Sequence, residues 1–137
     1  MKSIDVKVGR LLEARLVAPV SLEDLEEAHQ RLEHFFGAHP EKLVLVADYR
    51  RATVLTPEVA DRLLQIFRNF NHRIERSGAL VSTSAIFSMQ IERLIANANN
   101  PARRAFHDPF ELKTFIGSAL NRDEHVRLTQ FLAEEPT

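Results

Sequence analysis

The sequence predicts an α/β fold, a single domain in which a mixed sheet of about five strands is combined with four or five helices. Residues 43–47 are five consecutive apolar residues, so both faces of this strand must be covered, as in the middle of a layered sheet. The predicted elements run strand, strand, helix, and then strand and helix three times. This order is typical of an antiparallel start followed by parallel strands with right-handed crossovers.

Length and composition set the broad class. The chain has 137 residues, about one domain, and contains no cysteine, which excludes disulfides, thiolate metal sites and cysteine nucleophiles and fits a reducing compartment. No apolar stretch has the length of a signal peptide core or of a membrane span. We therefore expect a cytoplasmic protein with one domain over residues 1–120 and a C-terminal tail over residues 121–137.

The first forty residues predict a hairpin and a helix. Alternating apolar residues before Gly9 and the extended character of residues 11–18 predict two paired strands joined near Gly9. Ser21, followed three residues later by Asp24, is the start signal of a helix that we expect to end at Gly37.

The start of the second long helix follows the central strand. Thr56 is a candidate N-cap, and Pro57 suits the first helical position because it lacks the N–H that would have no partner there. The apolar face of this helix is expected to reach Ile74, with Gly78 as its left-handed stop and the next strand over residues 79–83.

The last third predicts a helix from Ser84, a short strand over residues 103–107, and a helix capped by Asp108. The segment beyond Asn121 could form an extra helix. Its apolar face would then need cover, from either a weak homodimer or a dock on its own domain. The residues of this face are Val126, Leu128, Phe131 and Leu132.

Charge is unevenly distributed along the chain. The formal net charge of −1 argues against a dedicated nucleic-acid binder. Residues 1–48 carry 6 basic and 9 acidic side chains, residues 49–107 carry 9 and 4, and residues 108–137 carry 3 and 6. The basic residues of the middle segment are all arginine. They are either solvated surface groups or a patch for an acidic partner surface or phosphate.

The chain resembles a STAS-type domain, the fold of anti-sigma-factor antagonists and of the cytoplasmic domains of sulfate transporters. The resemblance covers about residues 3–120 in the order of elements. It depends on the buried strand ending in Asp48, the turn over residues 52–55 and the helix start at Thr56. Residues 82–84 and 99–109 are similar to uncharacterised bacterial STAS-like proteins. The resemblance implies a STAS-like mixed sheet and a signalling role.

The resemblance also raises a question about regulation. In anti-sigma-factor antagonists the helix start carries Asp-Ser-Ser-Gly, and a partner kinase phosphorylates the second serine. Here the same places hold Thr56-Pro57-Glu58-Val59, so Glu58 replaces that serine. Glu58 is either a constitutive mimic of the phosphate, at a helix N-terminus that favours anions, or an ordinary first-turn residue.

No motif of the sequence favours catalysis. The four glycines are more than twenty residues apart, so no glycine-rich phosphate loop can form. The histidines at 29, 34 and 39 are five apart and do not share a helix face as metal ligands four apart would. The serines at 82 and 84 lack the glycines of a nucleophile elbow. We therefore predict no enzyme, no catalytic residue, no cofactor and no metal.

The function that these observations favour is a non-catalytic regulatory or scaffolding module. We expect it to bind another protein, with no nucleic-acid partner and no membrane span, through the loop and helix start around residues 48–62. The partner-binding candidates are Tyr49, Arg50, Arg51, Thr56, Glu58 and Arg62. The alternative is a small-ligand site for phosphate, a nucleotide or a lipid at the carboxyl edge of the sheet, where open α/β sheets bind ligands. Its candidates are Asp48, Ser82, Thr83, Ser84 and His107.

Overall fold

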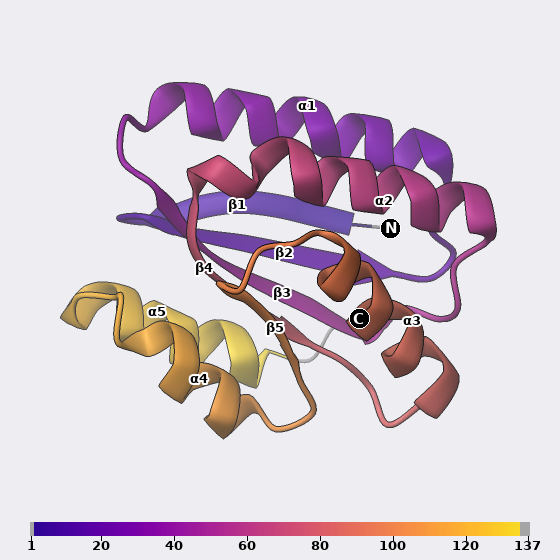
Figure 1. The fold of residues 1–137 in the computed structure, drawn as a ribbon. Coiled ribbons are helices and arrows are strands. Elements are labelled where there is room, and N and C mark those ends of the chain that lie inside the picture. The colour runs from indigo at the N-terminus through magenta and orange to yellow at the C-terminus, as the bar shows by residue number, and fades with distance from the viewer. Residues whose placement is uncertain (1, 135–137) are drawn as a thin grey trace.

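A five-stranded sheet in the order β1-β2-β3-β4-β5 forms the middle layer of the computed structural model, which describes residues 2–134 (Figure 1). The strands are β1 Lys2–Val8, β2 Leu11–Val17, β3 Leu43–Arg51, β4 Ile74–Leu80 and β5 Arg103–Phe106. Strand β1 is antiparallel to β2, and the other neighbours are parallel. The predicted mixed sheet with an antiparallel beginning is confirmed.

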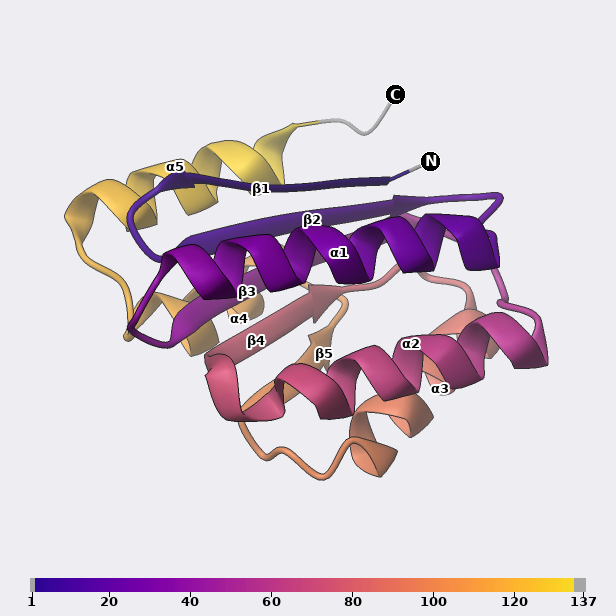
Figure 2. The same cartoon turned by 90° about the horizontal axis from the view of Figure 1, so that it is seen from above.

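Helices cover both faces of this sheet. They are α1 Leu22–Ala38, α2 Pro57–Phe70, α3 Ala85–Asn97, α4 Pro109–Gly117 and α5 Arg122–Ala133. Helices α1 and α2 lie on one face and α4 and α5 on the other, while α3 packs beside α2 and against β5 (Figures 1 and 2). No helix in the described part of the chain is long and apolar enough to cross a membrane.

The predicted helix starts are confirmed at the level of single atoms. The Ser21 hydroxyl accepts a hydrogen bond from the Asp24 N–H at 3.1 Å, and the Asp24 carboxylate accepts one from the Ser21 N–H at 3.0 Å. Thr56 caps α2 and Asp108 caps α4, each with a proline in the first turn. Local side-chain chemistry therefore sets where these helices begin.

The end of α2 differs from the prediction. The helix stops at Phe70, and Ile74 begins β4 after a single turn of 3-10 helix over Asn71–Arg73. Gly78 is therefore not a helix stop but lies inside β4. A Cβ there would lie 2.9 Å from the Leu112 side chain, so the missing side chain lets α4 pack closely on the sheet.

The core has two parts because β3 is buried on both faces. Leu43, Leu45 and Ala47 belong to the larger apolar cluster under α1 and α2, whereas Val44 and Val46 belong to the smaller cluster under α4 and α5. The uninterrupted apolar run of this strand is explained by these two layers.

The segment after Asn121 forms α5 and packs against its own sheet. Leu128, Phe131 and Leu132 are buried in the smaller cluster, while Val126 remains exposed. The Glu124 carboxylate caps α5 and also accepts a hydrogen bond from the Arg10 N–H at 2.6 Å, in the β1–β2 turn. Gly9 has a φ of +55°, and a Cβ at this position would collide with that carboxylate. A glycine is thus required both by the turn and by the close approach of α5.

Candidate functional site

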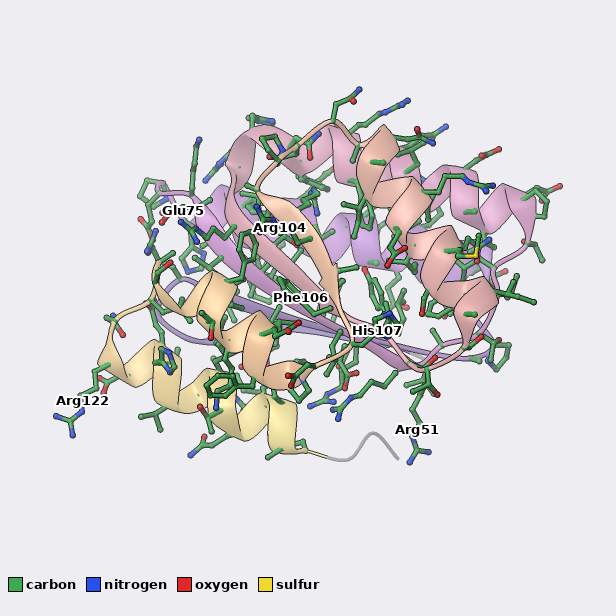
Figure 3. All side chains as sticks on the ribbon, turned by 60° about the horizontal axis from the view of Figure 1, so that its bottom comes forward. Arg51, Glu75, Arg104, Phe106, His107 and Arg122 are labelled. Atoms are coloured by element: carbon green, nitrogen blue, oxygen red, sulfur yellow. The ribbon has the colours of Figure 1, made fainter. Side chains whose placement is uncertain are left out.

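The carboxyl ends of the parallel strands meet at one edge of the sheet. Asp48 of β3 pairs in register with Leu80 of β4, which pairs with Phe106 of β5. The segments that follow these strands form the edge. We call residues 52–56, 81–84 and 107–108 the carboxyl edge. Figure 3 shows Arg51 and His107 toward this end and Glu75 and Arg122 at the opposite end.

Two arginines bind the Asp48 carboxylate. Its side chain is 1% exposed and accepts hydrogen bonds from Arg15 Nη1 at 2.6 Å, Arg50 Nε at 2.9 Å and Arg50 Nη2 at 3.0 Å. A buried carboxylate needs such partners to offset its lost hydration. Asp48 is therefore part of a structural ion cluster, and a small ligand at the carboxyl edge would not reach its oxygens without breaking these bonds.

The same two arginines hold the end of α5. Arg15 donates to the Phe131 carbonyl at 2.9 Å and its guanidinium lies 4.0 Å from the centre of the Phe131 ring. Arg50 donates to the Leu132 carbonyl at 3.3 Å. The candidate Arg50 thus links β3 to α5, and this role accounts for its position without a partner protein.

Two other partner-binding candidates also have structural roles. Tyr49 is 5% exposed and belongs to the core under α1 and α2, so its side chain does not contribute to a surface. Arg62 of α2 forms an ion pair with Glu26 of α1, with Nε and Oε1 2.6 Å apart. Hence neither Tyr49 nor Arg62 offers a free group at the helix start.

Three candidates remain exposed at the end of β3 and the start of α2. The Arg51 side chain extends into solvent (Figure 3). Thr56 is the exposed N-cap, with its hydroxyl 3.4 Å from the Val59 N–H. Glu58 is exposed in the first turn of α2. The structure therefore places Arg51, Thr56 and Glu58 where another protein can contact them.

The candidates for a small-ligand site are not brought together into one set. Ser82 Oγ accepts a hydrogen bond from the Ser84 N–H at 3.3 Å, which closes the turn before α3. Thr83, Ser84 and His107 are exposed, in contrast to the buried Asp48. The Ser82 hydroxyl thus supports the turn, and the exposed Thr83, Ser84 and His107 are separated by burial from the Asp48 carboxylate.

Sequence reasoning missed an apolar patch beside these residues. Gln90 of α3 binds Leu55 twice, accepting from its N–H at 2.8 Å and donating to its carbonyl at 2.9 Å. These two hydrogen bonds hold residues 52–56 against α3. Ile86 lies four residues before Gln90 and three residues before Met89, so its side chain is a neighbour of both on the helix surface. Ile86 and Met89 are 71% and 59% exposed, and Val54 of the loop is 52% exposed.

We refer to Val54, Ile86 and Met89 as the loop–α3 patch. The sequence carries a signal for it. The buried stripe of α3 is Phe87, Ile91 and Leu94, and the two α3 residues of the patch are apolar although they lie outside that stripe. On an ordinary surface helix polar residues would take those positions.

The arginines of residues 49–107 do not gather at this surface. Many of them bind backbone carbonyls elsewhere in the molecule, as Arg73 does with three carbonyls in the last turn of α1 and just after it. Others stack on aromatic rings, such as Arg104 over Phe115. Most arginines of this segment thus make contacts within the protein. This role differs from both sequence-based interpretations, which were solvated surface groups and a patch for an acidic partner surface or phosphate.

The fold is similar to that of a solved structure. The match is an uncharacterized protein from the DUF3478 family with a SpoIIAA-like fold, from Shewanella loihica PV-4. The TM-score is 0.65, the sequence identity is 18%, and the alignment covers 84% of this chain and 93% of that chain. The chain has a SpoIIAA-like, STAS-type fold.

The predicted STAS-like architecture is thereby confirmed. No protein-family model matches the chain, and no curated protein is similar to it in sequence. At 18% identity the similarity concerns the fold, and a fold of this kind can carry many functions. The function must therefore be argued from the surface of this chain itself.

Proposed function

We propose that this STAS-type domain is a non-catalytic regulatory or scaffolding module that binds another protein. The binding surface is the loop–α3 patch together with Arg51, Thr56 and Glu58. This surface differs from the one expected from the sequence because it leaves out Tyr49, Arg50 and Arg62 and includes α3.

The observation that carries the proposal is the exposure of three large apolar side chains on one fixed support. Single exposed apolar residues are common on soluble proteins, but a group of them beside polar residues is typical of interaction sites. The Gln90 bonds to Leu55 hold Val54 beside α3. Little conformational entropy is then lost when a partner covers the patch, because the loop is already ordered.

The charged neighbours suit the rim of such an interface. Arg51 and Glu58 are exposed and carry opposite charges, and they lie three residues before and four residues after Val54 in the chain. Exposed charges around an apolar centre contribute mainly to the association rate and to specificity. The arrangement thus has the apolar centre and polar rim that protein interfaces share.

The test is a comparison of bound proteins by affinity purification from the native cells. The double variant Ile86→Ser, Met89→Ser removes two apolar contacts, and Val126→Ser is the matched control because Val126 is also exposed but lies on α5. We expect the double variant to lose a partner that the control retains, with affinity reduced by about 10-fold or more for central interface residues. If both variants retain the same partners with the same affinity, the proposed surface is wrong.

A further inference from the structure

Strand β5 is one of the two outer strands of the sheet. In residues 2–134 it pairs with β4 on one side, and no strand lies on its other side. Figure 3 shows β5 between α3 and α4, with Arg104 and Phe106 on the strand and no other helix or strand in front of it. The strand shares no residue with the loop–α3 patch, so the inference drawn from it does not depend on the proposed function.

The backbone groups of β5 alternate between its two sides. The Phe106 carbonyl accepts a hydrogen bond from the Val81 N–H at 2.9 Å, so the backbone groups of Phe106 point toward β4. Neighbouring residues of a strand turn these groups to opposite sides, so those of Ala105 and Arg103 point away from β4. The Arg103 N–H is already bonded there, to the Asn100 carbonyl at 3.0 Å.

Three backbone groups therefore remain on the outer side of β5. They are the Arg103 carbonyl and the N–H and carbonyl of Ala105, and none of them has a hydrogen bond on that side with a residue that the structure describes. A row of such groups on an outer strand is a template for another extended segment. We call these groups the β5 edge.

Positive charge lies beside the start of the β5 edge. The Arg104 and Arg76 guanidinium groups lie 4.7 and 5.2 Å from the centre of the Phe115 ring, and Arg76 Nη1 donates to the Phe115 carbonyl at 2.6 Å. Arg104 is exposed. In residues 2–134 neither arginine forms an ion pair with a carboxylate. Both cations thus lack a counter-charge within the described chain.

The two arginines line an open hollow beside the first residues of β5. The other residues of its wall are Glu75, Pro101, Ala102 and Phe115. The Glu75 carboxylate is held by a third arginine, Arg10, with Oε1 and Nη1 2.8 Å apart. Beyond the other end of the strand, Asp108 and Glu111 are exposed acids. The surroundings of β5 are therefore basic at its start and acidic after its end.

We propose that an extended acidic segment of another protein adds to β5 as a further strand. Its backbone bonds to the Arg103 carbonyl and to the N–H and carbonyl of Ala105, and one of its acidic side chains lies in the hollow with Arg76 and Arg104. Strand addition takes its affinity from main-chain hydrogen bonds and its specificity from pockets for alternate side chains. A carboxylate matches the donors of a guanidinium.

A second copy of this chain fits the β5 edge less well. The strand has only four residues, so two β5 strands side by side would bring the Arg104 side chains of both copies close together. Like charges on facing strands destabilise the pairing. An acidic segment replaces this repulsion by attraction.

The test is a titration of the full chain with the end-capped peptide Thr-Glu-Val-Glu-Val-Glu-Val-Thr, followed by backbone amide NMR. The matched control peptide has glutamine in place of each glutamate. We expect the acidic peptide to bind saturably and about tenfold more tightly than the control, with the largest shifts in residues 103–107 and slower hydrogen exchange of the Ala105 N–H. Absence of saturable binding, or equal affinity for the two peptides, would overturn the proposal.

Two methylated peptides test the strand geometry. One carries backbone N-methyl groups at its glutamates and the other at its valines, so each lacks the N–H groups of one side of an extended strand. In an added strand one of these sides bonds to β5 and the other faces water. We expect one methylated peptide to lose binding and the other to keep it. Equal affinities of the two would contradict strand addition.

Variants of the protein locate the site. Arg104→Glu reverses an exposed charge and should remove the preference for glutamate over glutamine. Ala105→Pro removes an N–H that takes no part in the sheet and should weaken binding while the protein remains folded by circular dichroism, because an outer strand tolerates proline at such a position. Arg51→Glu is the matched control, since Arg51 is exposed and lies away from β5 (Figure 3).

Two further results would contradict the proposal. Binding that is lost in Arg51→Glu but kept in both Arg104→Glu and Ala105→Pro would place the peptide outside the β5 edge. Amide shifts in residues 103–107 that depend on protein concentration in the absence of peptide would identify a second copy as the occupant. Either result overturns the proposal.

Discussion

At the scale of single residues, Asp48 and Tyr49 show how two neighbours in one strand take opposite roles. Asp48 points toward α5 and joins the ion cluster with Arg15 and Arg50, while Tyr49 points into the core under α1 and α2. Successive side chains of a strand point to opposite faces, so this division follows from the strand itself. Each residue supports a separate prediction.

Replacement of Asp48 by Asn should strongly destabilise the protein. The substitution keeps the shape but leaves Arg15 and Arg50 without their shared carboxylate in a buried site. Breaking a buried ion pair from one side costs about 3–5 kcal/mol. The measurement is the free energy of unfolding in urea. Glu134→Gln is the control, because this carboxylate contacts Arg15 at 2.9 Å but is 46% exposed, and exposed pairs contribute about 0–1 kcal/mol. Equal effects of the two variants would contradict the role given to the ion cluster.

Tyr49 can be followed alone because it is the single tyrosine and the chain has no tryptophan. We expect its phenol to ionise near pH 12 in the folded protein and near pH 10 in urea, since burial disfavours the phenolate. The unfolded state loses this proton first, so the contribution of Tyr49 to stability is complete below pH 10 and is lost as pH rises toward 12. The shift corresponds to roughly 3 kcal/mol.

The measurement is the phenolate absorbance as a function of pH with and without urea. Tyr49→Phe provides the blank, because it removes the absorbing group. A folded-state midpoint near pH 10 would mean that the hydroxyl is open to water and would contradict its burial in the core.

At the scale of elements, the arginines hold the ends of the helices. In the described chain each of the five α-helices has a carbonyl near its C-terminus that accepts a hydrogen bond from an arginine of another element. The pairs are Arg73 with Phe36, Arg103 with Phe67, Arg68 with Asn97, Arg76 with Phe115 and Arg15 with Phe131. Helices α1, α3, α4 and α5 have no basic residue in their own last turn. The cation that a helix C-terminus favours is thus supplied from outside the helix.

Arg73→Met should therefore lower the free energy of unfolding by about 1.5–3 kcal/mol, the range for hydrogen bonds that involve a charged group. The substitution keeps much of the aliphatic length but removes the donors to Phe36, His39 and Glu41. Urea denaturation measures the effect. Arg51→Met removes an arginine that extends into solvent and should change stability by less than about 0.5 kcal/mol. A similar small change for Arg73→Met would refute the helix-end role.

The same elements show what can be predicted from the sequence. The sequence predicts Ser21, Thr56 and Asp108 as helix caps because capping depends on residues within one turn. The sequence does not predict toward which face of the sheet Asp48 and Tyr49 point. A strand that is buried on both faces has no alternation of apolar and polar residues from which the two faces could be told apart. The local sequence also does not predict the arginine contacts or the end of α2, because they depend on residues about 30 or more positions away in the chain.

At the scale of the whole molecule, α5 completes the second face of the sheet. Leu128, Phe131 and Leu132 cover Leu11, Val44 and Val46 in the smaller cluster. The ion pair of Arg127 with the buried Glu13, with Nε and Oε2 2.7 Å apart, fixes the helix against β2. Without α5 this face of the sheet would be exposed and Glu13 would lose its partner.

A chain that ends at Asn121 should consequently lose most of its stability or self-associate. Burial of three large apolar side chains contributes very roughly 4–9 kcal/mol, comparable with the 5–15 kcal/mol of a whole domain. Thermal unfolding by circular dichroism and the mass by light scattering measure the two outcomes, with the full chain as reference. An unchanged melting temperature together with an unchanged mass would show that the second face does not need α5.

The bonds between Gln90 and Leu55 have one more consequence at this scale. They occupy both the N–H and the carbonyl of Leu55, as a neighbouring strand would. A peptide that binds by adding a strand needs such backbone groups free, and at Leu55 they are not. Recognition at this loop must therefore proceed through side chains. Partner choice could then change by substitution of a few surface residues while the backbone stays the same.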